Sequence, residues 1–197
     1  MGGLTKTNAA RLLDRAKIPY ELIPYEVDEN NLAAGHVAES LGEDIRQVFK
    51  TIVLRGERTG YFVCVIPGNE EIDLKKAAKV AGDKKADLIH VKELLPLTGY
   101  IRGGCSPIGM KKSFPTFYHT TAPAFGHIFI SAGIRGLQLD VVTADCPGRR
   151  RDSCRCTSWR SIAIPAGIPS ITPPMAGPCD SPKLVSENIV PNLFMIL

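Results

Sequence analysis

The sequence predicts an α+β domain in which helices flank a mostly antiparallel or mixed β-sheet. Two observations support this class: strand segments follow one another as hairpins, and helical segments are inserted irregularly rather than after every strand. The chain has 197 residues, of which 44% are hydrophobic, so it can bury a sizeable core without disulfide bonds or a metal. This composition excludes collagen, a coiled coil and general disorder.

The N-terminal part of the chain predicts a helix, a strand and a second helix. Residues 7–17 have apolar residues at helical spacing, with Thr7 or Asn8 as the N-cap. A short strand is expected at 20–25, after an Ile-Pro step that ends the helix. Residues 31–41 form the second predicted helix, which a glycine closes.

A hairpin is predicted at the centre of the sequence. Residues 48–54 are rich in β-branched side chains, and residues 61–66 return after a glycine-bounded turn. Asp73 is expected to cap a helix over 74–81. The remaining predicted elements are a strand at 86–90, a short helix at 91–95, and strands at 116–119, 127–131 and 137–143.

Composition and charge change near residue 145. Residues 1–145 hold 18 basic and 17 acidic residues, a net charge of +1, whereas residues 146–197 hold 6 and 3, a net charge of +3. The second segment also carries 4 of the 6 cysteines, 8 of the 15 prolines and the only tryptophan. We therefore expect a domain over 1–145 and a poorly ordered Cys/Pro/Arg-rich tail over 146–197.

No targeting or membrane segment is apparent. The N-terminal residues lack an apolar core of the kind found in signal peptides, and no stretch approaches the roughly 18 apolar residues of a membrane span. Cys64 and Cys105, the two cysteines of the predicted domain, fit a reducing compartment. We expect a cytoplasmic protein.

Lys50 is the first candidate functional residue. It lies within the strand 48–54, where apolar side chains occupy both faces. Burying a lysine among them is costly, so its amine should either reach water at a sheet edge or serve a site.

The glycine-rich run 103–109 is the second candidate. Paired glycines allow the backbone to approach a ligand closely, and their N–H groups can donate to an oxygen that becomes negative during a reaction. The run lacks the spacing of nucleotide-binding loops, and a plain turn is the alternative. Cys105 lies inside it, either as a nucleophile or as a small buried residue.

Other polar residues suggest little further chemistry. The histidines show no metal-ligand spacing, and Cys154 and Cys156 form a CxC rather than a CxxC pair, so we expect no metal and no cofactor. Arg102 and the pair Lys111-Lys112 form a basic cluster beside the glycine run. They could contact an RNA phosphate or face solvent.

Several motifs together resemble the YbaK/EbsC proteins, which are Cys-tRNA(Pro)/Cys-tRNA(Cys) deacylases of the prolyl-tRNA editing superfamily. The resemblance runs in order from about residue 5 to residue 145. The motifs that carry it are KTNAA at 6–10, VFKT at 48–51, GGCSPIG at 103–109 with Lys111-Lys112 after it, and SAGIRGL at 131–137.

The resemblance implies a single domain around a twisted, partly closed β-structure, and a free-standing enzyme that removes cysteine from mischarged tRNA(Pro). It implies that Lys50, Gly103 and Gly104 act in catalysis. The positions that match the substrate pocket are Tyr25, Thr51, Ser106, Pro107, Ser131 and Gln138. Some relatives have an acid at the last of these, which weakens a charge-based role for Gln138. In this family the attacking group is thought to be the thiol of the substrate's own cysteine.

The tail departs from the family pattern. Relatives continue with a C-terminal helix after residues 141–145, whereas this chain has the Cys/Pro/Arg-rich segment. A shifted reading frame would produce such a change, and we state this as a hypothesis.

Two functions from different classes fit the sequence. The first is the deacylase, with aminoacyl-tRNA as substrate and prolyl-tRNA synthetase as an expected partner. The second is a non-catalytic module of the same fold that binds tRNA or a synthetase. Because the domain is nearly neutral, either function must depend on local lysines rather than on bulk charge.

Overall fold

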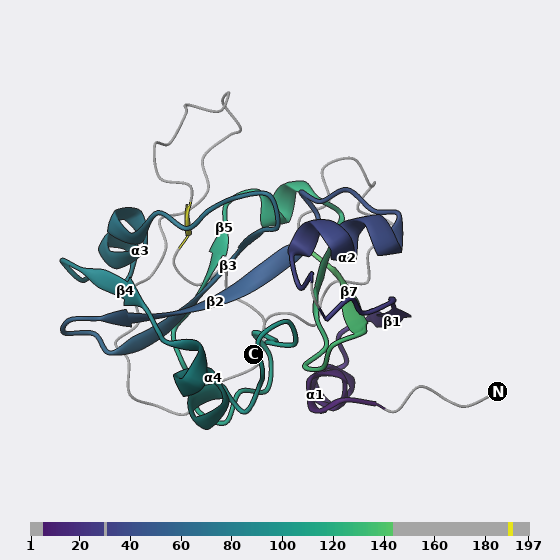
Figure 1. Cartoon of the computed structure of the whole chain (residues 1–197), viewed down its shortest axis with the longest axis horizontal. Helices are drawn as coiled ribbons and strands as arrows, with labels where there is room; N and C mark the ends of the chain where they lie inside the picture. Colours follow the sequence, from purple (N-terminus) through teal and green to yellow (C-terminus); the bar gives the residue numbers. More distant parts are fainter. Residues whose placement is uncertain (1–5, 30, 144–188, 191–197) are drawn as a thin grey trace.

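Two β-sheets form the frame of the domain (Figure 1) in a computed structural model that describes residues 6–29, 31–143 and 189–190. One sheet has the order β1-β7-β6 and consists of β1 (Tyr20–Pro24), β6 (His127–Ser131) and β7 (Leu137–Val142). The other has the order β4-β2-β3-β5-β8 and consists of β2 (Phe49–Gly56), β3 (Tyr61–Pro67), β4 (Ala86–Leu88), β5 (Thr116–His119) and β8 (Ile189–Val190). The β3–β5 pair is parallel and the other ladders are antiparallel, which confirms the predicted α+β class.

The helices largely follow the predicted ranges. They are α1 (Asn8–Ala16), α2 (Ala34–Leu41), α3 (Leu74–Val80), α4 (Val91–Thr98) and the short 3₁₀ helix η1 (Ala122–Ala124). Thr7 caps α1 by accepting a hydrogen bond from the Ala10 amide at 3.3 Å. Asp73 caps α3 by accepting from the Lys75 and Lys76 amides at 3.0 Å.

Two helix boundaries differ from the prediction. The second helix starts at Ala34 rather than at residue 31, because the Asn31 side chain accepts from the Ala33 amide and forms a turn before the helix. The fourth helix continues past residue 95 to Thr98, although Pro96 lies inside it. The proline removes one N–H donor, and the Gly99 amide still bonds to the Leu95 carbonyl to close the last turn.

Each sheet is covered on both faces. The largest core cluster lies between the sheets and includes the apolar face of α1. Ala77 and Ala78 of α3 cover the opposite face of the five-stranded sheet, against Leu54 and Phe62. Helix α2 covers the opposite face of the three-stranded sheet with Val37 and Ala38, which lie in one cluster with Val48 and Phe129.

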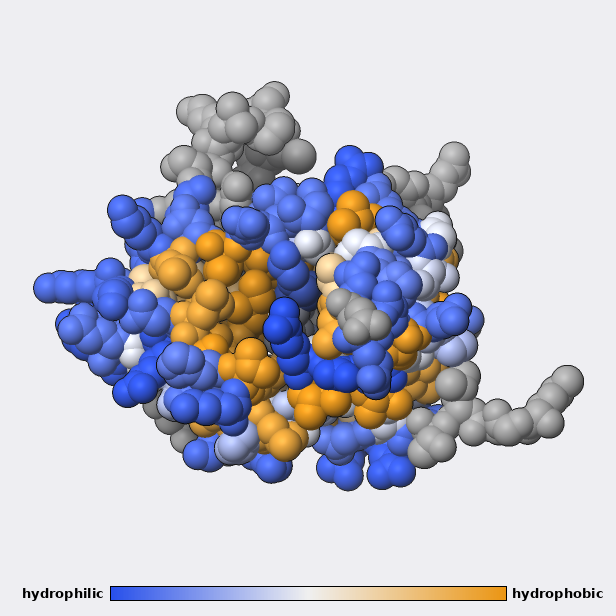
Figure 2. Space-filling view, viewed as in Figure 1, coloured by the Kyte–Doolittle hydropathy of each residue, from blue (hydrophilic) through white to orange (hydrophobic). Residues whose placement is uncertain are grey.

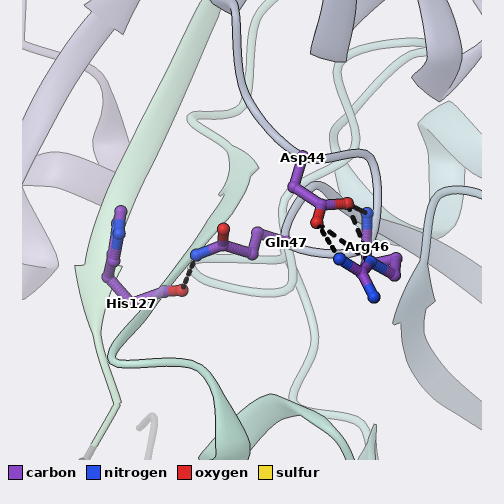
Figure 3. A network of polar contacts seen from close by, with 4 residues as sticks. All are labelled: Asp44, Arg46, Gln47 and His127. Atoms are coloured by element: carbon purple, nitrogen blue, oxygen red, sulfur yellow. Dashed lines mark hydrogen bonds and ion pairs between the residues drawn. The ribbon is translucent and has the colours of Figure 1, made fainter.

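The two sheets meet where β2 begins. Val48 forms an isolated parallel bridge with Phe129, and the Phe129 amide donates to the Gln47 carbonyl at 2.9 Å. Gln47 also donates through Nε2 to the His127 carbonyl at 3.2 Å, beside the ion pair of Arg46 with Asp44 (Figure 3). These bonds fix the start of β2, and therefore Lys50, relative to the three-stranded sheet.

The predicted domain boundary at residue 145 and nearly all of the predicted tail lie outside the described residues. Of the tail, the structure describes the strand β8, which pairs with the edge of β5. Over the described ranges, no helix is long and apolar enough to cross a lipid bilayer.

Candidate functional site

Two glycine-containing turns pack directly against each other. One turn follows α4 and contains Gly103, whose φ is +82°, and Gly104. A Cβ atom on Gly104 would lie 3.0 Å from the carbonyl carbon of Ile134 and 3.1 Å from the amide nitrogen of Arg135, in the turn between β6 and β7. Arg135 also donates through Nε to the Arg102 carbonyl at 3.0 Å. Two motifs that lie far apart in the sequence therefore form one unit.

The amides of the paired glycines differ in availability. The Gly104 N–H donates to the Ile101 carbonyl at 3.0 Å and closes the turn. The Gly103 N–H finds no acceptor within the described part of the chain. A predicted role as donor to a developing oxyanion therefore falls to Gly103, while Gly104 shapes the turn.

The loop continues inward after the glycines. Ser106 is fully buried, and its Oγ accepts a hydrogen bond from the Ile108 amide at 3.2 Å, while Pro107 is buried beside it. Tyr100 donates from its hydroxyl to the Ile108 carbonyl at 2.6 Å, and its ring lies 2.7 Å from where a Cβ on Gly133 would be. Ser106 and Pro107 thus support the loop from within.

The N-terminal motif also reaches this loop. Asn8, the first residue of α1, donates through Nδ2 to the Gly109 carbonyl at 3.1 Å. The φ of Gly109 is +75°, which favours glycine, and a Cβ there would lie 3.0 Å from Leu12 Cδ1. Three of the four motifs that suggested the family are therefore in direct contact.

Lys50 lies near the start of β2 and is half-buried. Its Nζ donates to the Gly68 carbonyl at 3.0 Å. Burial lowers the pKa of Lys50, whereas the charges of Glu71 and Glu70 raise it. Gly68 is tightly enclosed, since a Cβ there would lie 2.7 Å from the Cβ of Ala34. The Lys50 amine is thus held at a turn that touches the start of α2.

Thr51 points to the opposite face of β2 from Lys50. Side chains alternate along a strand, so Lys50 shares its face with Ile52, which packs against the α3 cluster. Thr51 shares its face with Phe49 and Val53, in the cluster between the sheets that also contains residues of the glycine loop. Its Oγ1 is buried and makes no hydrogen bond within the described residues. Unpaired buried hydroxyls are uncommon and often mark ligand contacts.

Tyr25, Ser131 and Gln138 gather at one end of the three-stranded sheet. Gln138 pairs with Ser131 across the β6–β7 ladder, and the Tyr25 amide donates to the Gly136 carbonyl at 3.0 Å. Gln138 is 6% exposed, and its Oε1 accepts no hydrogen bond in the described residues. Leaving such an amide oxygen unpaired costs about 1–3 kcal/mol, which makes it a candidate for substrate contact.

The segment that enters α2 connects these parts. Leu32 lies 3.2 Å from the position of a Cβ on Gly103, and Ala34 contacts Gly68, the partner of Lys50. Ala33, the N-cap residue of α2, has no side chain that could accept a hydrogen bond. The N–H groups in the first turn of α2 are therefore not capped by it. In Figure 2, a strip of hydrophilic side chains on this face separates the apolar area over β2 and β3 from the apolar area around α2.

A match to a known protein family shows which family this chain resembles over most of its described residues. Residues 28–147 match the family model described as the aminoacyl-tRNA editing domain. The chain belongs to this family. The match includes Lys50, both glycine turns and Gln138, so the family predicted from the sequence motifs is confirmed.

One named relative supports the same family assignment, a ligase matches over a shorter segment, and a solved structure shows the same fold. The editing domain is 51% identical over 136 residues to a protein of Enterococcus faecalis named "Putative Cys-tRNA(Pro)/Cys-tRNA(Cys) deacylase EbsC", and the match covers 69% of this chain and 83% of the relative. It is 32% identical over 76 residues to a proline–tRNA ligase of Thermosipho africanus, covering 39% of this chain and 13% of the ligase. A crystal structure described as a putative trans-editing enzyme for prolyl tRNA synthetase has a TM-score of 0.60 at 19% identity, covering 68% of this chain and 84% of that one.

The sequence analysis missed several residues that assemble the editing domain's site. Nothing in the sequence patterns singles out Gly68, Leu32 or Ala34. Their contacts join segments that are distant along the chain, and no local pattern marks them. A glycine between a strand and a helix was the one available signal.

Cys105 is not an activated nucleophile in this structure. It is 8% exposed, and burial raises its pKa to about 12. We expect iodoacetamide at pH 7.5 to label Cys105 much more slowly in the native protein than in urea, as measured by mass spectrometry of the peptide that contains it. Comparable labelling rates would show instead that this thiol is accessible and reactive.

Proposed function

We propose that this editing domain is a free-standing deacylase that releases cysteine from Cys-tRNA(Pro), and also from Cys-tRNA(Cys). The observation that carries the proposal is the 51% identity to a relative that is named for this activity. The arrangement of the site agrees with it, since the structure provides a cation and an unpaired backbone donor near the segment that enters α2, and unpaired buried oxygens on Thr51 and Gln138.

Cleavage of the aminoacyl ester needs stabilisation of charge on the carbonyl oxygen. In this proposal the Gly103 amide donates to that oxygen, because its hydrogen is not used inside the turn. Lys50 contributes a positive charge, either to the same oxygen or to the terminal nucleotide. Its hydrogen bond to the Gly68 carbonyl holds the ammonium in place without neutralising it.

The attacking group is the thiol of the esterified cysteine. Its sulfur forms a bond to the ester carbonyl carbon, the bond from that carbon to the ribose oxygen breaks, and the proton lost by the thiol ends on the ribose hydroxyl. The products are the cyclic thioester of cysteine, which water then opens, and free tRNA. The buried, protonated Cys105 supports this assignment, since the glycine loop offers no thiolate of its own.

Substrate orientation falls to the residues on the three-stranded sheet. In this proposal the unpaired Gln138 Oε1 accepts a hydrogen bond from the α-amino group of the substrate, and Ser131 lies beside it on the neighbouring strand. Tyr25 lies at the same end of the sheet. Thr51 supplies a second unpaired oxygen from β2. Because Gln138 is uncharged, it orients the amine without fixing its protonation state.

The test compares tRNA(Pro) charged with cysteine, alanine or proline. The protein should release cysteine, and should release alanine at least about 10²-fold more slowly, since a binding pocket alone separates small side chains by only about 10–200-fold. Equal release of alanine and cysteine would overturn the thiol mechanism but leave deacylation intact. Binding of all three without release would favour the non-catalytic module instead.

Prolyl-tRNA synthetase is the partner we propose for delivery of the tRNA. The similarity to a segment of a proline–tRNA ligase supports this choice. Co-elution of the editing domain with the synthetase in the presence of tRNA(Pro), and not in its absence, is the expected result on size-exclusion chromatography.

A further inference from the structure

The two packed turns each expose an isoleucine followed by an arginine. Ile101-Arg102 lies in the turn that leads into the paired glycines, and Ile134-Arg135 lies in the turn between β6 and β7. The bond from Arg135 Nε to the Arg102 carbonyl joins them at 3.0 Å. We call these four residues the Ile–Arg patch. None of them is among the site residues that the family motifs suggested.

The isoleucines of the patch are two of the five exposed large apolar residues of the described domain, and the other three, Leu88, Val91 and Leu95, lie on or next to α4. Ile101 is 44% exposed and Ile134 is 48% exposed, while isoleucines elsewhere in the described domain are largely covered. Two exposed isoleucines brought together from distant segments present an apolar surface rather than scattered residues. Such a surface is suited to contact with a flat apolar group.

The arginines of the patch carry no ion pair. Arg46 pairs with Asp44 and Arg58 with Asp83, whereas neither Arg102 nor Arg135 has a carboxylate partner among the described residues. Arg135 is anchored through Nε, which leaves its terminal nitrogens as donors in a fixed plane. Two unpaired guanidinium groups beside an apolar surface match a ligand that has both phosphates and aromatic faces.

The position of the patch indicates which ligand it binds. A Cβ on Gly103 would lie 3.4 Å from Arg135 Nε, so the patch adjoins the amide that we assign to the ester carbonyl. We propose that the Ile–Arg patch binds the single-stranded 3′ end of the aminoacyl-tRNA, with its phosphates on the arginines and its bases on the isoleucines and guanidinium planes. This inference rests on the proposed function only in placing the ester at Gly103.

The experiment measures binding of uncharged tRNA(Pro), with and without its single-stranded 3′ end, over a range of salt concentrations. The R102Q/R135Q variant should bind intact tRNA about tenfold more weakly. The slope of log K against log salt should fall by about 1.4, which corresponds to two phosphates at about 0.7 each. The I101S/I134S variant should weaken binding to a similar extent with an unchanged slope. R11Q/R15Q, which changes two exposed arginines on α1, is the matched control and should bind normally.

The trimmed tRNA separates the possible outcomes. Wild type and the patch variants should bind tRNA without its single-stranded 3′ end equally weakly, since this tRNA lacks the part that the patch binds. If R102Q/R135Q loses the same affinity for intact and for trimmed tRNA, the proposal is overturned, because the arginines then contact the double-stranded part of the tRNA. Because the measurement uses uncharged tRNA, the patch can be confirmed even if the protein fails to release cysteine. If the protein releases cysteine and the variants bind tRNA as wild type does, only the proposal about the patch is refuted.

Discussion

Replacing Lys50 with alanine is expected to lower kcat/KM for Cys-tRNA(Pro) by about 10²- to 10³-fold, the range found when one charge-stabilising donor is removed from an active site. The Lys50 ammonium is half-buried and is held by a single hydrogen bond to the Gly68 carbonyl. The carboxylates of Glu70 and Glu71, whose charges raise the pKa of Lys50, are exposed at the surface. Replacing Lys50 therefore removes the cation that we propose stabilises charge on the substrate. The measurement is release of labelled cysteine under single-turnover conditions.

A matched variant separates this effect from general loss of positive charge. Lys92 is exposed on α4, and K92A should retain wild-type kcat/KM. K50R should not restore activity, because a planar guanidinium cannot occupy the space of an ammonium against the Gly68 carbonyl. If K50A and K92A are equally active, Lys50 is simply a lysine whose amine reaches the sheet surface, which is the alternative that the sequence left open.

Local features of the fold could be predicted because they depend on neighbouring residues. The caps at Thr7 and Asp73 follow from side chains that bond amides two or three positions later. The hairpin of β2 and β3 follows from alternation and a short turn. The start of α2 could not be placed, because the Asn31 side chain accepts from the Ala33 amide and holds residues 31–33 in a turn before the helix.

The site was predicted as a set of residues but not as an arrangement. Alternation along β2 indicated that Lys50 and Thr51 lie on opposite faces, and the structure agrees. The contact of Lys50 with Gly68 depends on the hairpin and on the packing of α2, which no local pattern encodes. For the same reason, the sequence could not distinguish Gly103 from Gly104, whereas in the structure only the Gly104 amide is bonded, to the Ile101 carbonyl.

Gly104→Ala is expected to destabilise the domain and to lower its activity. The added Cβ would lie 3.0–3.2 Å from Ile134 and Arg135, and the atoms it meets include the Ile134 carbonyl carbon and the Arg135 amide nitrogen. Since these are backbone atoms, the two turns must separate. Overpacking of this kind lowers the free energy of unfolding by about 1–3 kcal/mol. The turns must move apart by a few tenths of an ångström, which shifts the neighbouring Gly103 amide. Since a misplacement of about 1 Å costs about 10²-fold, we expect kcat to fall by up to about 10²-fold.

Gly35→Ala is the matched control for this substitution. Gly35 lies inside α2 near the same site, and its added Cβ would meet only the Ile45 side chain at 3.8 Å, an ordinary contact. Alanine is favoured over glycine in a helix by up to about 1 kcal/mol, so G35A should be as stable as wild type or more stable, and fully active. Both variants are compared by urea unfolding and by cysteine release.

The double variant G104A/I134A tests the cause of the defect. If the clash were with the Ile134 side chain, trimming that side chain would restore activity. Because the clash is with the backbone, the double variant should remain as impaired as G104A. Recovery in the double variant, or wild-type kinetics in G104A itself, would mean that the turns are not packed as tightly as these distances require, and the role of Gly104 in shaping the donor at Gly103 would have to be abandoned.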